Sequence, residues 1–172
     1  MDAPARRMHP LVLTAIIASV VLGAGIWIYA LYIADVRLPD QLDDSTFPQA
    51  AQPICSKARD ELKAADLVLT TARSPQERAD LSVTADDILA KMVTSLEALP
   101  RPAGNDGTAV TAWLGDWRQW LQERADWEAK LRQGQDVPFL EAQRKTGEPA
   151  SKSLSTMAVN NAMPDCGIPD GV

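Results

Sequence analysis

The feature that most constrains this chain is a run of 24 consecutive uncharged residues, Leu11 to Ala34, near the start of its 172 residues. As a helix this run would be about 36 Å long at roughly 1.5 Å per residue, enough to cross a hydrocarbon layer of about 30 Å. Arg6 and Arg7 precede the run and Asp35 follows it. The positive-inside rule therefore predicts a cytoplasmic tail over residues 1–10, a transmembrane anchor over residues 11–34 and an extracytoplasmic remainder.

A cleaved signal peptide is the alternative interpretation of the same run. Its apolar part should have about 7–15 residues and should end at small side chains. This run is longer, and Tyr32 stands near its end, where a small residue is needed. No cysteine lies there to carry a lipid, so an uncleaved single-pass anchor is the prediction.

Three small residues mark one face of the predicted anchor. Ala15, Ser19 and Gly23 recur every four residues, and such a ridge lets a second helix approach closely. The sequence thus predicts contact with the lipid bilayer and with another membrane protein or a second copy of this chain.

The only two cysteines, Cys55 and Cys166, bracket the part of the chain that follows the anchor. Outside the cytoplasm such a pair most simply forms one disulfide, and two buried free thiols are the alternative. Metal binding by the pair is disfavoured, because the only histidine is His9, before the anchor. We expect no metal and no cofactor.

After a polar, proline-punctuated linker over residues 35–50, the pattern predicts an all-α domain over residues 51–172. Apolar residues recur at helical spacing from Pro53, which suits a first helical turn, and again after the capping sequence SPQE at residues 74–77. A third helix is expected from a cap at Thr108 to about Gln133, with Gly134 after its end. Weaker signals at residues 138–140 and 154–161 allow a fourth, so the prediction is a three- or four-helix bundle closed by one disulfide.

The third predicted helix carries four of the five tryptophans. They fall on one side of a helical wheel, and they are Trp113, Trp117, Trp120 and Trp127. Burial in the bundle core is the simpler interpretation, and an exposed stripe for a ligand or partner is the alternative. Arg124 lies within the same arc and must be paired or stacked, with Glu128 and Glu61 as candidate partners.

Charge and residue types exclude several functions. From Asp35 onward the chain has 15 Lys and Arg against 22 Asp and Glu, which disfavours nucleic-acid binding. Without a histidine there, the outer domain has no Ser-His-Asp or Cys-His arrangement, so we expect no enzyme and no catalytic residues. The pairs Asp43-Asp44 and Asp86-Asp87 fit no calcium loop and are expected in solvent, in the linker and on the outer face of the second helix.

The chain resembles a group of uncharacterised actinobacterial membrane proteins that have one N-terminal span and an outer helical domain. The resemblance lies in the sequence WLGDW at residues 113–117, in Arg124, and in NNAMPDC at residues 160–166. It implies a fold and a location but no activity. The leading hypothesis is a non-catalytic accessory or interaction subunit of a membrane complex in the cell envelope, and the alternative is an extracytoplasmic module that binds or senses a small ligand.

Overall fold

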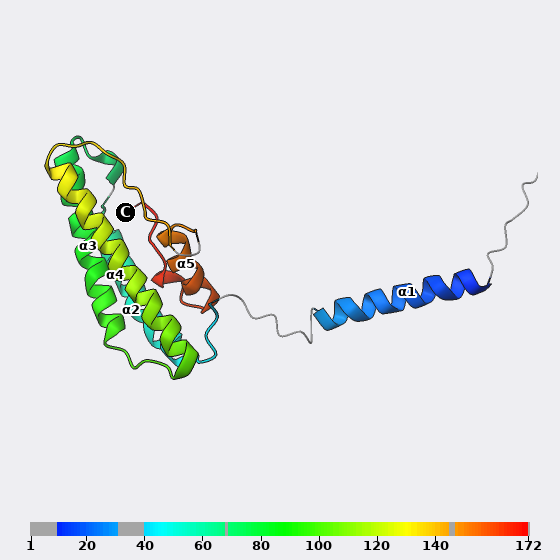
Figure 1. Cartoon of the computed structure of the whole chain (residues 1–172). Coiled ribbons are helices and arrows are strands. Elements are labelled where there is room, and N and C mark those ends of the chain that lie inside the picture. Colours follow the sequence, from blue (N-terminus) through cyan, green and yellow to red (C-terminus); the bar gives the residue numbers. More distant parts are fainter. Residues whose placement is uncertain (1–9, 31–39, 68, 145–146, 172) are drawn as a thin grey trace, which may run out of the picture. The chain divides into compact units, whose positions relative to one another are not determined.

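The computed structural model of the chain describes residues 10–30, 40–67, 69–144 and 147–171 (Figure 1). Regular structure in these residues is helical, apart from one isolated bridge between Gln143 and Pro149. The chain divides into two units, with α1 in the first and every later helix in the second. The prediction of an all-α protein is confirmed for the described part.

The first unit contributes one described helix, α1 (Pro10–Ile28), which has no acidic or basic residue in its first or last turn. Its large apolar side chains are exposed, and Trp27 keeps 67% of its surface accessible. The hydroxyl of Ser19 donates to the carbonyl of Ala15 at 3.0 Å, so the helix satisfies its own polar group. Residues 1–9 and 31–34 of the predicted tail and anchor lie outside the described residues.

A search of the described helices for a membrane span finds none that is both long enough and apolar enough.

The second unit is built on three long helices that lie side by side, α2 (Thr46–Ala65), α3 (Pro75–Glu97) and α4 (Gly104–Arg132) (Figure 1). α3 packs against both α2 and α4. Successive helices are joined by short connections, which makes neighbours antiparallel. Their facing sides bury a single main core, whose fully buried apolar members on these helices include Trp117, Trp120, Leu89, Leu96 and Val93.

Two shorter elements complete the bundle. α5 (Ala150–Asn160) packs against α4, and the 3-10 helix η3 (Pro164–Cys166) packs against α2 and α5. Residues 138–140, where a further helix was predicted, are not helical. The disulfide between Cys55 and Cys166 is confirmed, with Cα atoms 5.0 Å apart, and it ties η3 to α2.

α2 begins seven residues before the predicted start at Pro53, so the predicted linker over residues 35–50 is wrong in its last part. Phe47 is only 2% exposed, and with Ala51 it extends the buried stripe of α2 toward the N-terminus. Pro53 lies within the helix and points to solvent. The physical reason is that a proline, which lacks an N–H, favours a first turn without requiring one, and the exposed ring of Pro53 is accommodated inside α2.

The residues just before α2 are also bound to the bundle. The N–H of Leu42 donates to Oδ1 of Asn161 at 2.7 Å. The N–H groups of Asp43 and Asp44 donate to Oδ2 of Asp106 at 2.9 and 2.8 Å. A carboxylate of Asp44 then accepts the N–H of Thr46 at 2.7 Å, which lowers the pKa of Asp44. This segment is therefore part of the folded domain.

Of the other predicted helix ends, two are correct and one is wrong. The Oγ of Ser74 accepts the N–H of Glu77 at 3.1 Å, as the capping sequence predicts. Gly134 follows α4 with φ +81°, and its N–H donates to the carbonyl of Leu131 at 2.9 Å. Thr108 does not cap α4, because the helix begins at Gly104 and the Thr108 hydroxyl donates back to the Gly104 carbonyl at 3.3 Å.

Candidate functional site

The four tryptophans of α4 are buried, in agreement with the core interpretation of their stripe. Trp113 and Trp117 meet edge to face at 6.4 Å between ring centroids, and Trp117 and Trp120 do so at 5.7 Å. The indole N–H of Trp113 donates to the carbonyl of Leu154 at 3.1 Å and so fastens α5 to α4. The stripe is thus a packing spine of the bundle and offers no open aromatic surface.

Arg124 is enclosed between α4 and α3, with only 1% of its surface exposed. Its Nε lies 2.6 and 2.9 Å from the two carboxylate oxygens of Asp86. Its Nη2 donates to the hydroxyl of Ser82 at 2.7 Å. Charge-assisted bonds of this kind compensate for the removal of the guanidinium from water.

Aromatic rings close the remaining faces of the guanidinium. The Arg124 Cζ atom lies 4.9 Å from the ring centroid of Trp120, 5.8 Å from that of Trp127 and 5.6 Å from that of Phe139. At these distances the negative ring faces attract the cation. Phe139 comes from the irregular residues that follow α4, so the cluster joins three parts of the chain.

A second carboxyl group adjoins this pair. Glu128 is buried one turn after Arg124 and lies within hydrogen-bonding reach of Asp86. Desolvation raises the pKa of Asp86 to about 7, because burial together with the hydrogen bond and charge of Glu128 outweighs the attraction of Arg124. The group formed by Ser82, Asp86, Arg124 and Glu128 is called the ionic cluster below.

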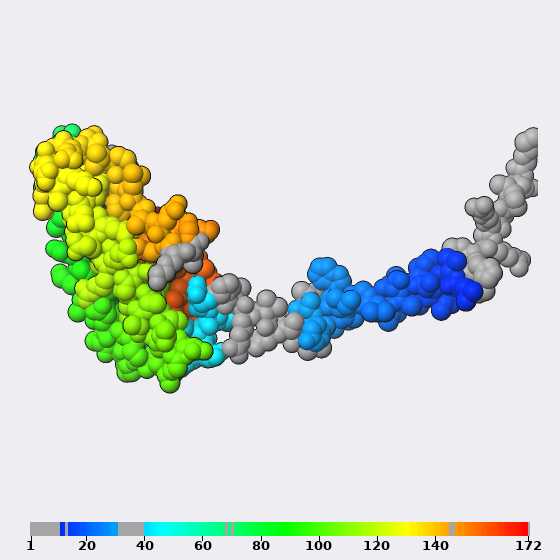
Figure 2. All heavy atoms as spheres, viewed as in Figure 1, coloured from blue at the N-terminus to red at the C-terminus, as the bar shows by residue number. Residues whose placement is uncertain are grey.

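Residues 135–144, called the cover segment below, lie over the ionic cluster. The indole N–H of Trp127 donates to the carbonyl of Val137 at 2.8 Å. Glu123 accepts the N–H of Ala142 at 3.3 Å and the Nη1 of Arg144 at 3.0 Å. In Figure 2 the atoms that directly follow α4 (yellow to orange) lie on the surface of the bundle.

The carboxylate that pairs with Arg124 is that of Asp86, so the predicted partners, Glu128 and Glu61, were wrong. Glu61 is exposed and lies 3.9 Å from Lys57 on its own helix. Asp86 was expected in solvent, but its side chain is only 14% exposed, because its helix position faces α4. Asp87, its neighbour, is exposed as expected.

A second stripe on α3 is the signal that could have located Asp86. Residues three and four apart on the side of α3 that is buried against its neighbours are Ala79, Ser82, Asp86, Leu89, Val93 and Leu96. Because two of its members, Ser82 and Asp86, are polar, the stripe does not stand out as a pattern of apolar residues. If these six residues are treated as one stripe, the hydroxyl of Ser82 and the carboxyl of Asp86 are predicted to lie beside the buried face of α4.

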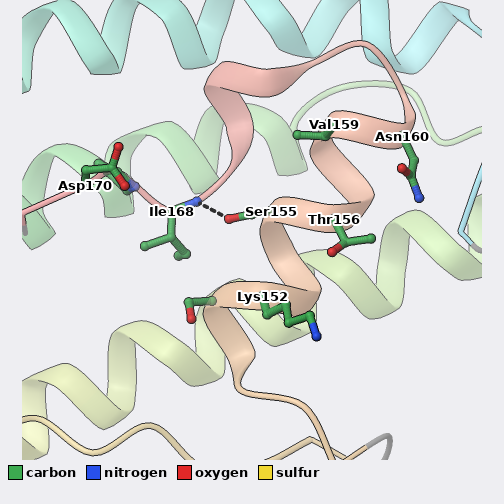
Figure 3. Close-up of a pocket in the computed structure, with 9 residues that line it drawn as sticks. Lys152, Ser155, Thr156, Val159, Asn160, Ile168 and Asp170 are labelled. Carbon is green, nitrogen blue, oxygen red and sulfur yellow. Dashed lines mark hydrogen bonds between the residues drawn. The ribbon is translucent and has the colours of Figure 1, made fainter.

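A separate surface groove lies between α5 and the C-terminal residues (Figure 3). The N–H of Ile168 donates to the hydroxyl of Ser155 at 3.1 Å across its floor. A side chain at Gly167 would meet the Ser155 hydroxyl at 3.0 Å, so the glycine permits this close approach. The groove is shallow and mostly apolar, and Lys152 on its rim already pairs with Glu148 at 2.8 Å.

No group of acidic, cysteine or histidine side chains suited to a metal ion is found in the described residues. Comparisons with family models, with curated proteins and with solved structures find no match to this chain. The resemblance to actinobacterial membrane proteins therefore stays a prediction.

Proposed function

We propose that this protein is a non-catalytic interaction subunit of the cell envelope, held in the membrane by residues 11–34, with the helical bundle that contains α2 to η3 as its extracytoplasmic domain. The bundle would act as a rigid body that presents its surface to another subunit.

The observation that carries the proposal is the apolar surface of α1. Its exposed side chains are bulky on several sides of the helix, and they include Leu11, Ile17, Val20, Ile26 and Trp27. A helix that is apolar all round needs an apolar surrounding. α1 alone would be about 28 Å long at roughly 1.5 Å per residue, and the uncharged run continues beyond it to Ala34.

The disulfide supports the proposed location. Cys55 and Cys166 form one bond and no cysteine remains free. Stable disulfides are typical of compartments outside the cytoplasm. An extracytoplasmic bundle agrees with the order of basic and acidic residues on the two sides of the uncharged run.

The interior of the bundle supports a role in interaction more than one in ligand binding. Arg124 and the four tryptophans were the candidate ligand contacts, and they contact one another, Asp86 and Phe139. A small ligand would have to displace the cover segment to reach them.

Purification of the tagged full-length protein from native membranes in mild detergent, followed by mass spectrometry, tests the proposal. We expect a second membrane protein, or a second copy, at near-stoichiometric yield. The variant Gly23→Leu should lose this partner, because a bulky side chain on the ridge formed with Ala15 and Ser19 keeps the second helix at a distance. Gly25→Leu is the matched control, since it adds the same side chain on the opposite face of α1. Equal retention by wild type and Gly23→Leu would contradict a contact along this ridge, and recovery of a monomer would contradict the proposal.

A further inference from the structure

The ionic cluster contains two acids and one base. Asp86 from α3 and Glu128 from α4 lie beside the single guanidinium of Arg124, and Ser82 adds only a neutral hydroxyl. With both carboxyls ionised, the cluster would have one uncompensated negative charge. A buried charge without a partner is strongly unfavourable, and a bound proton removes that cost.

The hydrogen bonds around Glu128 point to where this proton resides. Its Oε1 is buried and receives no hydrogen bond from the described residues. Its carboxyl nevertheless lies within hydrogen-bonding reach of the carboxyl of Asp86. Two ionised carboxylates are acceptors only, so a bond between them needs a proton on one of them.

Several other charged groups of the surrounding elements form ion pairs of their own. Their ion pairs are Lys57 with Glu61, Arg78 with Asp136, Arg132 with Asp80, and Arg144 with Glu123 and Asp116. η2 (Leu69–Thr71), which packs against α3, has no ionisable side chain. Arg124 and Glu128 are therefore the charged groups that act on Asp86.

We propose that Asp86 and Glu128 share one proton in the folded protein, and that release of this proton to water as the pH rises loosens the cover segment. The proposal does not depend on the membrane anchor or on a partner protein. It describes a pH-dependent opening of the face of the bundle that holds Arg124.

The cover segment is the part that should respond. It is irregular, and Phe139 is its contact with the guanidinium. Its main ties to α4 are the hydrogen bonds from Trp127 to Val137 and from Ala142 and Arg144 to Glu123. The helices beside it have continuous backbone hydrogen bonds and wide buried faces, so local opening costs less in the cover segment.

Hydrogen exchange with mass spectrometry, on the full chain in detergent from pH 5 to 7.5, tests the proposal. Rates are corrected for intrinsic exchange, and a peptide from α2 serves as the reference within each sample. In the wild type, protection of the cover segment should fall by up to about tenfold per pH unit, as release of one proton requires, and it should stay below that of α2 at every pH. Asp86→Asn and Glu128→Gln should each remove this dependence, because neither retains the carboxyl pair.

Asp87→Asn is the matched control, since it removes an exposed acid at the adjacent position. This variant should keep the pH dependence of the wild type. Protection of the cover segment that does not change with pH in the wild type would overturn the proposal. Protection of the cover segment as high as that of α2 at every pH would overturn it as well, because the opening would then be global. If Asp86→Asn does not fold, Glu128→Gln alone decides.

Discussion

Asp86 on α3 places both of its carboxylate oxygens on one atom of α4, the Nε of Arg124, at 2.6 and 2.9 Å. The two helices otherwise meet mainly through apolar side chains. This ion pair thus joins the two most extensively packed helices of the bundle at a position closed to water.

Replacement of Arg124 by methionine should lower the free energy of unfolding by about 3–5 kcal/mol, because it leaves two buried carboxyls without their cation. Chemical denaturation of the full chain measures the change. Arg118→Met is the control on the same helix, since Arg118 also pairs with an acid of α3, Glu97, but near the surface. Its loss should be at most about 1 kcal/mol. Equal losses in the two variants would argue against a special role for the buried pair.

Stability should decline as the pH rises from about 5 to 7. The pKa of Asp86 is raised to about 7 in the folded protein, above its usual value when unfolded, so the folded state binds the proton more tightly. The contribution of Asp86 to the free energy of unfolding is complete below its pKa in the unfolded chain. It is lost as the pH rises through its pKa in the folded protein, at up to about 1.4 kcal/mol per pH unit. Denaturant titrations at several pH values measure the slope.

Between pH 5 and 7 the measurement avoids groups whose contribution to stability increases with pH. The pKa of Glu97 is lowered by its hydrogen bond to Arg118, so its contribution is present at high pH and is lost in acid, below the range of the titration. Stability that stays level or increases between pH 5 and 7 would contradict the assignment of the proton to the ionic cluster.

Two glycines of α4 should respond in opposite directions to alanine. A Cβ atom at Gly107 would lie 2.3 Å from the carbonyl oxygen of Pro102, whereas at Gly115 nothing lies within 4 Å. Gly107→Ala should therefore destabilise the bundle despite the higher helix propensity of alanine. Gly115→Ala should stabilise it by about 0.5–1 kcal/mol. Thermal unfolding of the two variants compares them, and a stabilising Gly107→Ala would show that the chain before α4 can move away.

Removal of the disulfide should cost up to about 4–5 kcal/mol, because the bond closes a loop of 111 residues in the unfolded chain. The double variant Cys55→Ala, Cys166→Ala measures this by denaturation without a reducing agent. Ser56→Ala is a control beside the bond. A double variant as stable as wild type would mean that η3 is held to α2 mainly by contacts such as that of Arg59 Nε with the carbonyl of Asp165, at 3.0 Å.

The helices could be predicted because apolar side chains at helical spacing have few alternatives to burial. Capping signals such as Ser74 and Gly134 gave correct ends where the motif acts locally. The start of α2 could not be predicted, because Phe47 is buried by a distant part of the chain, and a local pattern does not contain that contact. The partner of Arg124 could not be predicted for the same reason, since only tertiary packing distinguishes Asp86 from Asp87.

Amine labelling of intact cells shows whether residues 11–34 anchor an extracytoplasmic bundle. All six lysines follow Ser56, so a membrane-impermeant amine reagent reports on the bundle. Lys57, with 80% of its side chain exposed, should be labelled in intact cells, and the protein should remain with the membrane after alkaline extraction. Lysine labelling only after the cells are broken, or release of the protein by alkali, would contradict the account.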